Sequence, residues 1–173
     1  FLQGCRKQIF ITFAVFALVK VHGMSIHTTI WLMFINQLLI TVTGTWFGRL
    51  IDRHGERLML SISYIILALV FVGYGVIEHR PTLYVLYCID NLVFFGAIAL
   101  TTYLNKMAPP EDLKPSLSMG VMFNHISSVT APLIGGFAWY YFGYQVIFFA
   151  GAFFALVSLG FTQFMPSRTA VEG

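Results

Sequence analysis

The chain has 173 residues, of which 58% are hydrophobic and only 10% are charged, and its mean hydropathy is +0.80. Soluble domains carry about 25% charged residues, so this composition excludes a soluble globular domain and makes lipid the expected solvent. The net charge of +3 arises from ten Lys and Arg against seven Asp and Glu. These cations lie between apolar runs rather than along one solvated face, which argues against a nucleic-acid partner.

The start of the sequence carries no targeting signal that we can identify. It begins at Phe1, and no basic segment with a small-residue cleavage site precedes the first apolar run. We therefore expect a piece of a longer chain. Cys5 and Cys88 lie in separate apolar segments, which favours small core residues over a disulfide or a zinc site. No metal and no cofactor are expected.

Six apolar segments predict transmembrane helices, because a helix needs roughly 20 apolar residues to cross the hydrocarbon. The expected spans are 1–22, 26–50, 57–77, 82–105, 116–140 and 143–165, followed by a polar tail, 166–173. The apolar run from Gln8 to Val21 is too short to cross alone, so the first span must include residues 1–7. Arg6 and Lys7 then lie within the membrane thickness, where they either line a cavity or extend to the headgroups.

The short loops predict the orientation of these spans. Cations on one side are Arg49, Arg53, Arg57, Lys106, Lys114 and Arg168, and those on the other are Lys20 and Arg80. An excess of Lys and Arg marks the cytoplasmic face. Loops 49–57 and 105–116 and the C-terminus are therefore expected in the cytoplasm.

Polar residues inside the spans divide the six helices into two similar triads. In each triad the first two helices carry a polar pair and the third is featureless. The pairs are Arg6 and Lys7, then Asn36 and Gln37, in the first triad, and Asp90 and Asn91, then Asn124 and His125, in the second. This indicates an all-α membrane protein built as a 3+3 inverted repeat, which is a pattern of many secondary transporters.

Three of these pairs are expected near the middle of the membrane. At a rise of roughly 1.5 Å per residue, the pairs at 36–37, 90–91 and 124–125 fall near the centre of a core roughly 30 Å thick. Helical spacing places Tyr87 on the face of Asp90. The alternative is that the amides join neighbouring helices and that His125 is a structural hydrogen-bond donor.

Asp90 is the strongest candidate for a functional group, because a carboxylate at this depth needs a partner or water. Arg6 and Lys7 are natural counter-charges, although counting residues places them about 10 Å closer to the cytoplasm. Without a fixed partner, Asp90 would serve as a proton carrier. His125 could share that relay, since its charge changes near neutral pH.

Residues 48–57 form a turn motif between the second and third expected spans. The segment reads Gly-Arg-Leu-Ile-Asp-Arg-His-Gly-Glu-Arg. Gly55 can adopt a positive φ in a tight turn, and Gly48 can permit the close approach of another helix. Asp52 can pair with Arg53 and Arg57 or meet the N-terminus of a neighbouring helix. A simple basic loop that sets the topology is the alternative.

This motif resembles the loop signature of the major facilitator superfamily. The matching residues are Gly48, Leu50, Asp52, Arg53, Gly55 and Arg57. In the fifth span, Pro132, Gly135 and Gly136 form a Pro-x-x-Gly-Gly pattern, which is similar to a helix kink of the same family. Residues 4–10 resemble the seventh helix of some bacterial members.

The resemblance extends over nearly the whole chain and implies one half of a transporter that has two six-helix halves. We expect the C-terminal half, helices seven to twelve, in a bacterial inner membrane, with an N-terminal six-helix half as its partner. The implied function is secondary active transport of a small solute by alternating access, coupled to protons through Asp90.

Two other function classes remain open at this point. One is a six-helix membrane interaction module without transport activity, and the other is an intramembrane enzyme that uses Asp90 or His125. The sequence has no phosphate-binding Gly-rich loop, no His-Glu-x-x-His pair and no Gly-x-Ser-x-Gly turn. Neither ATP-driven transport nor enzymatic activity is therefore expected.

Overall fold

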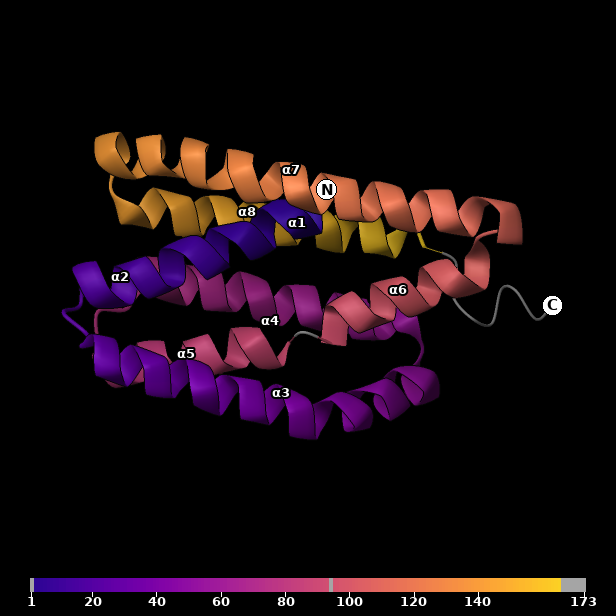
Figure 1. Ribbon diagram of the computed structural model, residues 1–173, viewed down its shortest axis with the longest axis horizontal. Helices are drawn as coiled ribbons and strands as arrows, with labels where there is room; N and C mark the ends of the chain where they lie inside the picture. The colour runs from indigo at the N-terminus through magenta and orange to yellow at the C-terminus, as the bar shows by residue number, and fades with distance from the viewer. Residues whose placement is uncertain (1, 94, 166–173) are drawn as a thin grey trace.

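The computed structural model describes residues 2–93 and 95–165, and within them it contains helices joined by short turns and no strand (Figure 1). The expected tail at 166–173, with Arg168, lies outside the described residues. Six helical stretches are long and apolar enough to cross a membrane: Leu2–Lys20, Ile26–His54, Glu56–Val76, Arg80–Met107, Glu111–Phe142 and Tyr144–Gln163. The prediction of an all-α membrane protein with six spans is confirmed.

Two of the six spans are irregular. The first consists of α1 (Leu2–Ile9), a π-helical turn η1 (Phe10–Ala14) and α2 (Val15–Lys20). The fourth is divided into α5 (Arg80–Leu92) and α6 (Phe95–Met107), because the backbone leaves helical geometry at Val93, with ψ 7°. The apolar run at 82–105 predicts one continuous helix, and the structure divides it. Within the membrane, non-helical backbone is tolerated where it is buried in protein or lines a cavity.

The other four spans are single helices. They are α3 (Ile26–His54), α4 (Glu56–Val76), α7 (Pro110–Phe142) and α8 (Tyr144–Gln163). The Ser25 hydroxyl caps α3 by accepting a hydrogen bond from the Thr28 amide at 3.1 Å. Gly55, with φ 85°, separates α3 from α4, and Gly143, with φ 87°, separates α7 from α8. A residue with a Cβ would be strained at either turn.

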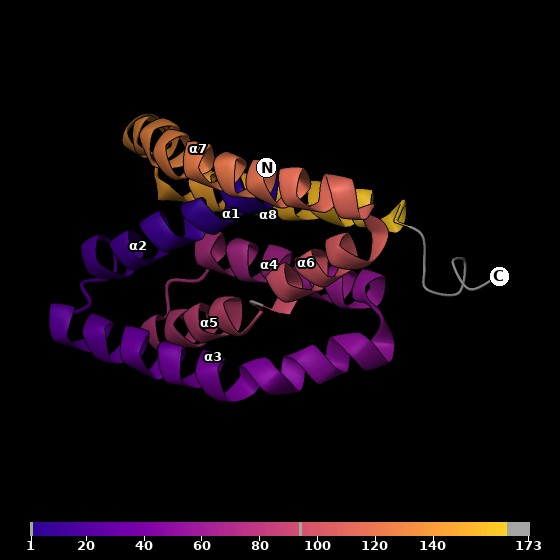
Figure 2. The same ribbon diagram turned by 45° about the vertical axis from the view of Figure 1, so that its right-hand side comes forward.

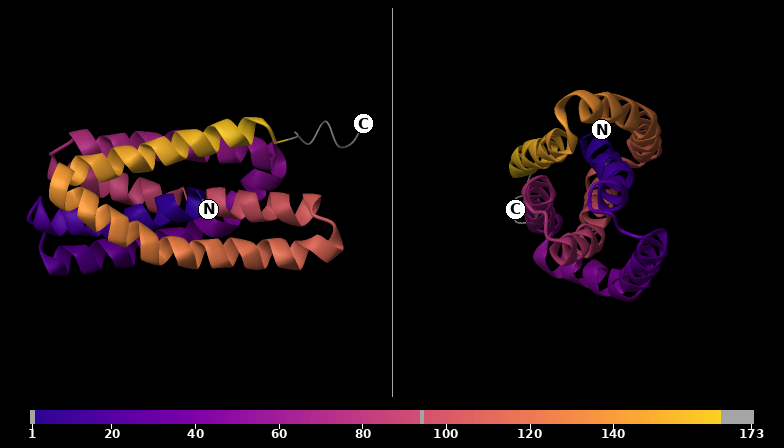
Figure 3. Two further views of the ribbon diagram at one scale, coloured as in Figure 1. Left: turned by 90° about the horizontal axis from the view of Figure 1, so that it is seen from above. Right: turned by 90° about the vertical axis from the view of Figure 1, so that its left-hand side faces the viewer.

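Helices α4 and α8 pack side by side along one side of the bundle and form its most closely packed pair (Figure 3). Tyr74 and Phe148 stack with ring centroids 5.0 Å apart, and both side chains are fully buried. The Phe71 ring lies directly over Gly151, where no Cβ would fit. Large aromatic surfaces against a glycine give the close contact on which helix association in membranes depends.

Helices α3 and α7 lie on opposite sides of the bundle and are its most exposed members (Figure 2). Only Thr29, Asn36 and Ile51 of α3 are buried, and Ser127 is the buried residue of α7 among those described. Both helices present large apolar side chains outward, such as Val42 at 71% and Val129 at 70% exposure. These faces require lipid or further protein around them.

Candidate functional site

A cavity of about 240 Å³ opens between the first, second, third and fourth spans. Its polar lining comes from α1, α4 and α5: Gln3, Arg6, Lys7, Ser63, Tyr64, Tyr87, Asp90 and Asn91. Its apolar lining includes Phe10, Ile11, Met33, Ile40, Leu67 and Val93. Both backbone irregularities, the π-turn of the first span and the break at Val93, therefore border the cavity. Such irregular segments in membrane helices are frequent at functional sites.

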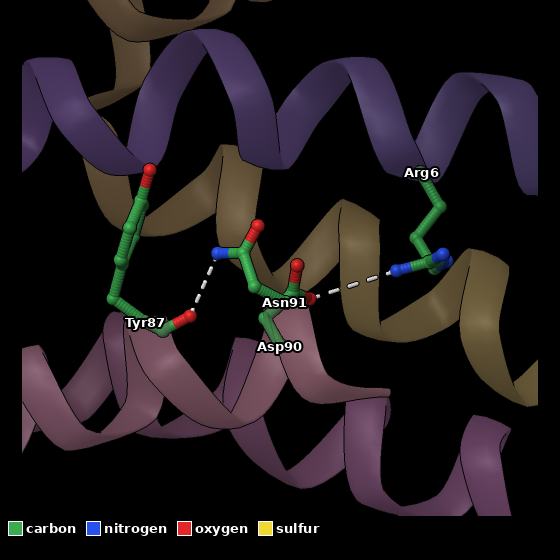
Figure 4. Close-up of polar contacts among 4 residues, drawn as sticks. All are labelled: Arg6, Tyr87, Asp90 and Asn91. Carbon is green, nitrogen blue, oxygen red and sulfur yellow. Dashed lines mark hydrogen bonds and ion pairs between the residues drawn. The ribbon is translucent and has the colours of Figure 1, made fainter. Parts of the chain in front are cut away.

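Arg6 and Asp90 form an ion pair inside this cavity (Figure 4). Arg6 Nη1 lies 3.6 Å from Asp90 Oδ1, and the two side chains are only 9% and 11% exposed. This separation exceeds the 2.7–3.2 Å of an ordinary hydrogen bond. Arg6 Nε and Asp90 Oδ1 also have no hydrogen-bond partner among the described residues. The pair therefore neutralises charge without saturating the hydrogen-bonding capacity of either group.

Arg6 and Asp90 are in contact although residue counting predicts different depths in the membrane for them. Counting along straight helices placed Arg6 about 10 Å from the level of Asp90, but the two side chains meet directly. The first span runs obliquely across the bundle (Figure 1), and the long Arg6 side chain projects from α1 toward Asp90 (Figure 4). Residue counting gives depth along one helix axis and cannot allow for tilt or side-chain reach.

The end of α5 holds Asp90 and Asn91 at the cavity wall. The Asn91 side-chain amide donates to the Tyr87 carbonyl oxygen at 2.9 Å, as Figure 4 shows. This bond uses a backbone acceptor in the last turn of α5, just before the helix ends at Val93. Asn91 therefore stabilises the helix end from which Asp90 projects.

On one side the cavity is bordered by a cluster of aromatic rings, of which Phe10 and Tyr87 belong to its lining. Phe10 stacks on Tyr87 with centroids 5.6 Å apart and meets Tyr74 edge to face at 5.5 Å. The Tyr74 hydroxyl donates to the Leu83 carbonyl oxygen at 3.1 Å, which fixes this ring between α4 and α5. A solute on this side would have to displace a packed aromatic cluster.

The structure does not bring all the predicted site residues together. Arg6, Lys7, Tyr87, Asp90 and Asn91 share the cavity, whereas its lining does not include Asn36, Gln37, Asn124 or His125. Gln37 and His125 are exposed on the bundle surface. The three polar pairs therefore do not all line this cavity, because helical rotation points the members of a pair in different directions.

Asn36 and Asn124 have distinct surroundings of their own. Asn36 is 4% exposed, and neither its amide nitrogen nor its amide oxygen has a hydrogen-bond partner among the described residues. Asn124 lies against Gly4 of α1, so that a Cβ at Gly4 would come within 3.5 Å of its side-chain oxygen. On the same face, Cys5 Sγ and Ser127 Oγ lie 3.4 Å apart. Asn124 thus sits where α7 packs on α1.

Sequence reasoning missed the contribution of the third span. It treated residues 57–77 as featureless, yet Ser63 and Tyr64 of α4 line the cavity beside Arg6. Gly96 of α6 lies against Ser63, and a Cβ there would come within 2.6 Å of the Ser63 hydroxyl. Two adjacent polar residues in an otherwise apolar run were the available signal. Gln3, at the start of α1, was missed as well.

The loop motif lies at the end of the bundle where α3 turns into α4. Glu56 pairs with Lys106 of α6, and Arg57 donates to the Gln163 side-chain oxygen of α8 at 3.4 Å. The motif therefore connects α4 to two other helices. The close approach expected at Gly48 is not met within the bundle, since no atom lies within 4 Å of a Cβ placed there.

The Pro-x-x-Gly-Gly segment lies inside α7, which bends in its C-terminal part (Figure 3). Pro132 is within the helix and removes one backbone donor there. Gly135 lies directly against the Phe13 ring of the π-turn, whereas nothing approaches within 4 Å of a Cβ at Gly136. Of the two glycines, Gly135 therefore permits the contact between α7 and the first span.

Within the described residues, no group of three or more His, Cys, Asp or Glu side chains is placed to hold a metal ion. Residues 1–171 match the family model described as Major Facilitator Superfamily. No curated protein and no solved structure gives a significant match. Since the family match covers nearly the whole sequence, the chain belongs to the major facilitator superfamily of membrane transporters.

Proposed function

We propose that this protein is a proton-coupled secondary transporter of a small solute and that Asp90 is the proton-carrying group. The single observation that carries the proposal is the Arg6–Asp90 ion pair in a cavity between four spans. Ionisable groups within a membrane are costly and mark substrate or proton pathways. The two groups here lie at the break of one span and beside the π-turn of another.

The geometry of the pair supports its use as a switch. Removing two charges from water costs several kcal/mol per ion, and only a well-bonded pair recovers this. At 3.6 Å, with Asp90 Oδ1 and Arg6 Nε unpartnered, the attraction is incomplete. Protonation of Asp90 would remove one charge from the cavity and release the Arg6 guanidinium for another partner.

We further propose that the chain is the C-terminal half of such a transporter, with helices seven to twelve arranged as a 3+3 inverted repeat. Alternating access would then occur between this half and an N-terminal six-helix half. The outward apolar faces of α3 and α7 leave apolar surface on which a second six-helix half could pack. The basic loops at 49–57 and 105–116 support an orientation with these loops in the cytoplasm, in a bacterial inner membrane.

The proposed coupling can be tested with full-length protein reconstituted in vesicles. In Asp90→Asn, we expect proton-driven accumulation of the transported solute to be lost while solute exchange across the membrane continues. Asp112→Asn is the matched control, because Asp112 is exposed at the start of α7 and should accumulate solute normally. Normal accumulation by Asp90→Asn would disprove the proton-carrying role. Failure of every variant and of the parent to exchange solute would favour an interaction module instead.

A further inference from the structure

The lining of the cavity that contains Arg6 and Asp90 also includes a second cation, Lys7, which is exposed to solvent. Among the described residues, neither of the ion pairs involves Lys7. Asp90 is the only acidic residue of that lining. The lining of the described cavity therefore carries two positive charges, one of them on the exposed Lys7, and one negative charge, so that it attracts an anion before any proton binds.

We propose that the cavity binds a small organic monoanion, with a carboxylate or similar planar acidic group, together with one proton; this rests on the proposed transport function. A proton from the aqueous phase adds to a carboxylate oxygen of Asp90. Arg6 thereby loses its counter-charge. The acidic group of the solute takes that place, accepting hydrogen bonds from the Arg6 guanidinium and the Lys7 ammonium. No covalent bond changes except the O–H bond formed and later broken at Asp90.

The net charge of the cavity is the same before and after the proton and the monoanion bind. The empty cavity has a net charge of one positive unit, from Arg6, Lys7 and ionised Asp90. The loaded cavity has the same net charge, because the proton and the monoanion cancel. Moving the cavity between the two sides of the membrane then carries the same charge with or without solute. The movement of solute with its proton is consequently electroneutral and does not respond to the membrane potential.

The other titratable groups near Asp90 do not supply a competing charge. Tyr74 of α4 and Tyr87 and Cys88 of α5 lie within electrostatic range of the carboxylate or beside it, and Tyr64 faces Arg6. Phenols and thiols are ordinarily neutral at pH 7. Helices α3 and α6 add no titratable side chain to the cavity lining. Asp90 is therefore the group whose protonation changes the charge of the cavity.

The remaining lining indicates the body of the solute. Apolar side chains from four spans, among them Phe10, Met33 and Leu67, surround the charged group. The volume of about 240 Å³ is below the roughly 300–1,000 Å³ of drug-sized ligand pockets. A small molecule with one acidic group and an apolar or aromatic portion fits both observations.

Charged thiol reagents test the sign of the net charge in the cavity, and this test does not require the solute to be known. In the full-length protein, Cys5→Ala and Cys88→Ala remove the native thiols of the described chain, and Ala97→Cys or Gln3→Cys places one in the lining. We expect an anionic sulfonatoethyl methanethiosulfonate to react about tenfold faster than the cationic trimethylammonioethyl reagent, relative to their rates with free mercaptoethanol. Asp90→Asn should increase this ratio, and Lys7→Gln should decrease it. Equal rates, or faster reaction of the cationic reagent, would overturn the proposal.

Transport of three probes of similar shape tests the coupling. Benzoate, benzamide and benzylamine are supplied to vesicles that contain the full-length protein, with protein-free vesicles to correct for passive movement. We expect a pH gradient to drive protein-dependent accumulation of benzoate alone, a potassium diffusion potential to have no effect, and Asp90→Asn to abolish it. Gradient-driven benzylamine or benzamide would overturn the substrate class and leave the transport function standing. If none of the three is driven, the substrate class is overturned, while solute exchange by the parent protein decides the transport function separately.

Discussion

The α4–α8 interface and the Arg6–Asp90 cavity lie within the same bundle but are built in opposite ways. Along α4 and α8, aromatic rings such as Tyr74 and Phe148 stack and are fully buried. Around the cavity, one span changes to a π-turn, another breaks, and charged atoms lack hydrogen-bond partners. The α4–α8 interface is closely packed, whereas the cavity contains polar atoms without hydrogen-bond partners among the described residues.

The difference indicates which part of the protein is the scaffold and which is the working part. A closely packed interface resists deformation, because any shift creates voids or overlaps. A cavity with a loose ion pair can change its contacts at low cost, because few optimal interactions are lost. The following changes test this contrast, beginning with the largest expected effect.

Removal of one partner of the cavity ion pair should have the largest effect. Arg6→Met leaves Asp90 buried without its counter-charge, and we expect a loss of about 3 kcal/mol in the free energy of unfolding. Replacing both charges, in Arg6→Met with Asp90→Leu, should recover most of this loss. Denaturant titration of the full-length protein in detergent measures both. A double variant as unstable as the single one would show that packing, not charge, dominates this region.

Crowding of the scaffold should have the next largest effect. Gly151→Ala places a methyl group against the Phe71 ring, and we expect a loss of about 2 kcal/mol. Gly160→Ala is the matched control on the same helix, since no atom lies within 4 Å of a Cβ there. Thermal unfolding of the two variants compares them directly. Equal stability of both would mean that α4 and α8 are not closely packed.

Substitution of Asn36 tests whether a buried amide without a hydrogen-bond partner among the described residues lowers the stability of the protein. Asn36→Leu removes a buried amide that has no hydrogen-bond partner among the described residues, and we expect a gain of about 1 kcal/mol in stability. Transport should decrease in the same variant if the amide contacts water or solute during the cycle. Gln37→Leu, at the adjacent exposed position, is the control. A less stable Asn36→Leu protein would indicate a partner outside the described residues.

The ion pair at the bundle end should be the weakest of these interactions. Lys106 is 50% exposed while its partner Glu56 is 10% exposed, so solvent screens much of the attraction. We expect Lys106→Met to cost about 0.5 kcal/mol, and less at high salt. Lys114→Met, at an exposed position, serves as the control. A loss comparable to that of Arg6→Met would remove the distinction between the two ion pairs.

Much of the fold could be predicted from the sequence, because apolar runs of sufficient length must cross lipid as helices. The six spans and the turn at Gly55 follow from such local rules. The break at Val93 and the π-turn at Phe10–Ala14 could not be predicted in this way. No Gly or Pro marks either position, and their backbone geometry depends on neighbouring helices.

The candidate site was predictable in part. Arg6 and Asp90 were identifiable as charged residues within apolar segments, since the cost of burying charge makes such residues rare. That they meet, and that Gln37 and His125 lie apart from them, required the rotation and tilt of each helix. Ser63 and Tyr64 enter the cavity for the same reason, from a helix that looked purely structural.

Composition and hydropathy by themselves determined that this protein is helical, lies in a membrane and crosses it six times. These properties depend on the transfer of each segment from water to lipid, which is a sum over local residues. Tertiary structure alone decided which polar side chains share a cavity and which face outward. That outcome depends on the packing of whole helices, where small residues such as Gly96 and Gly135 set how closely and at what angle neighbours meet.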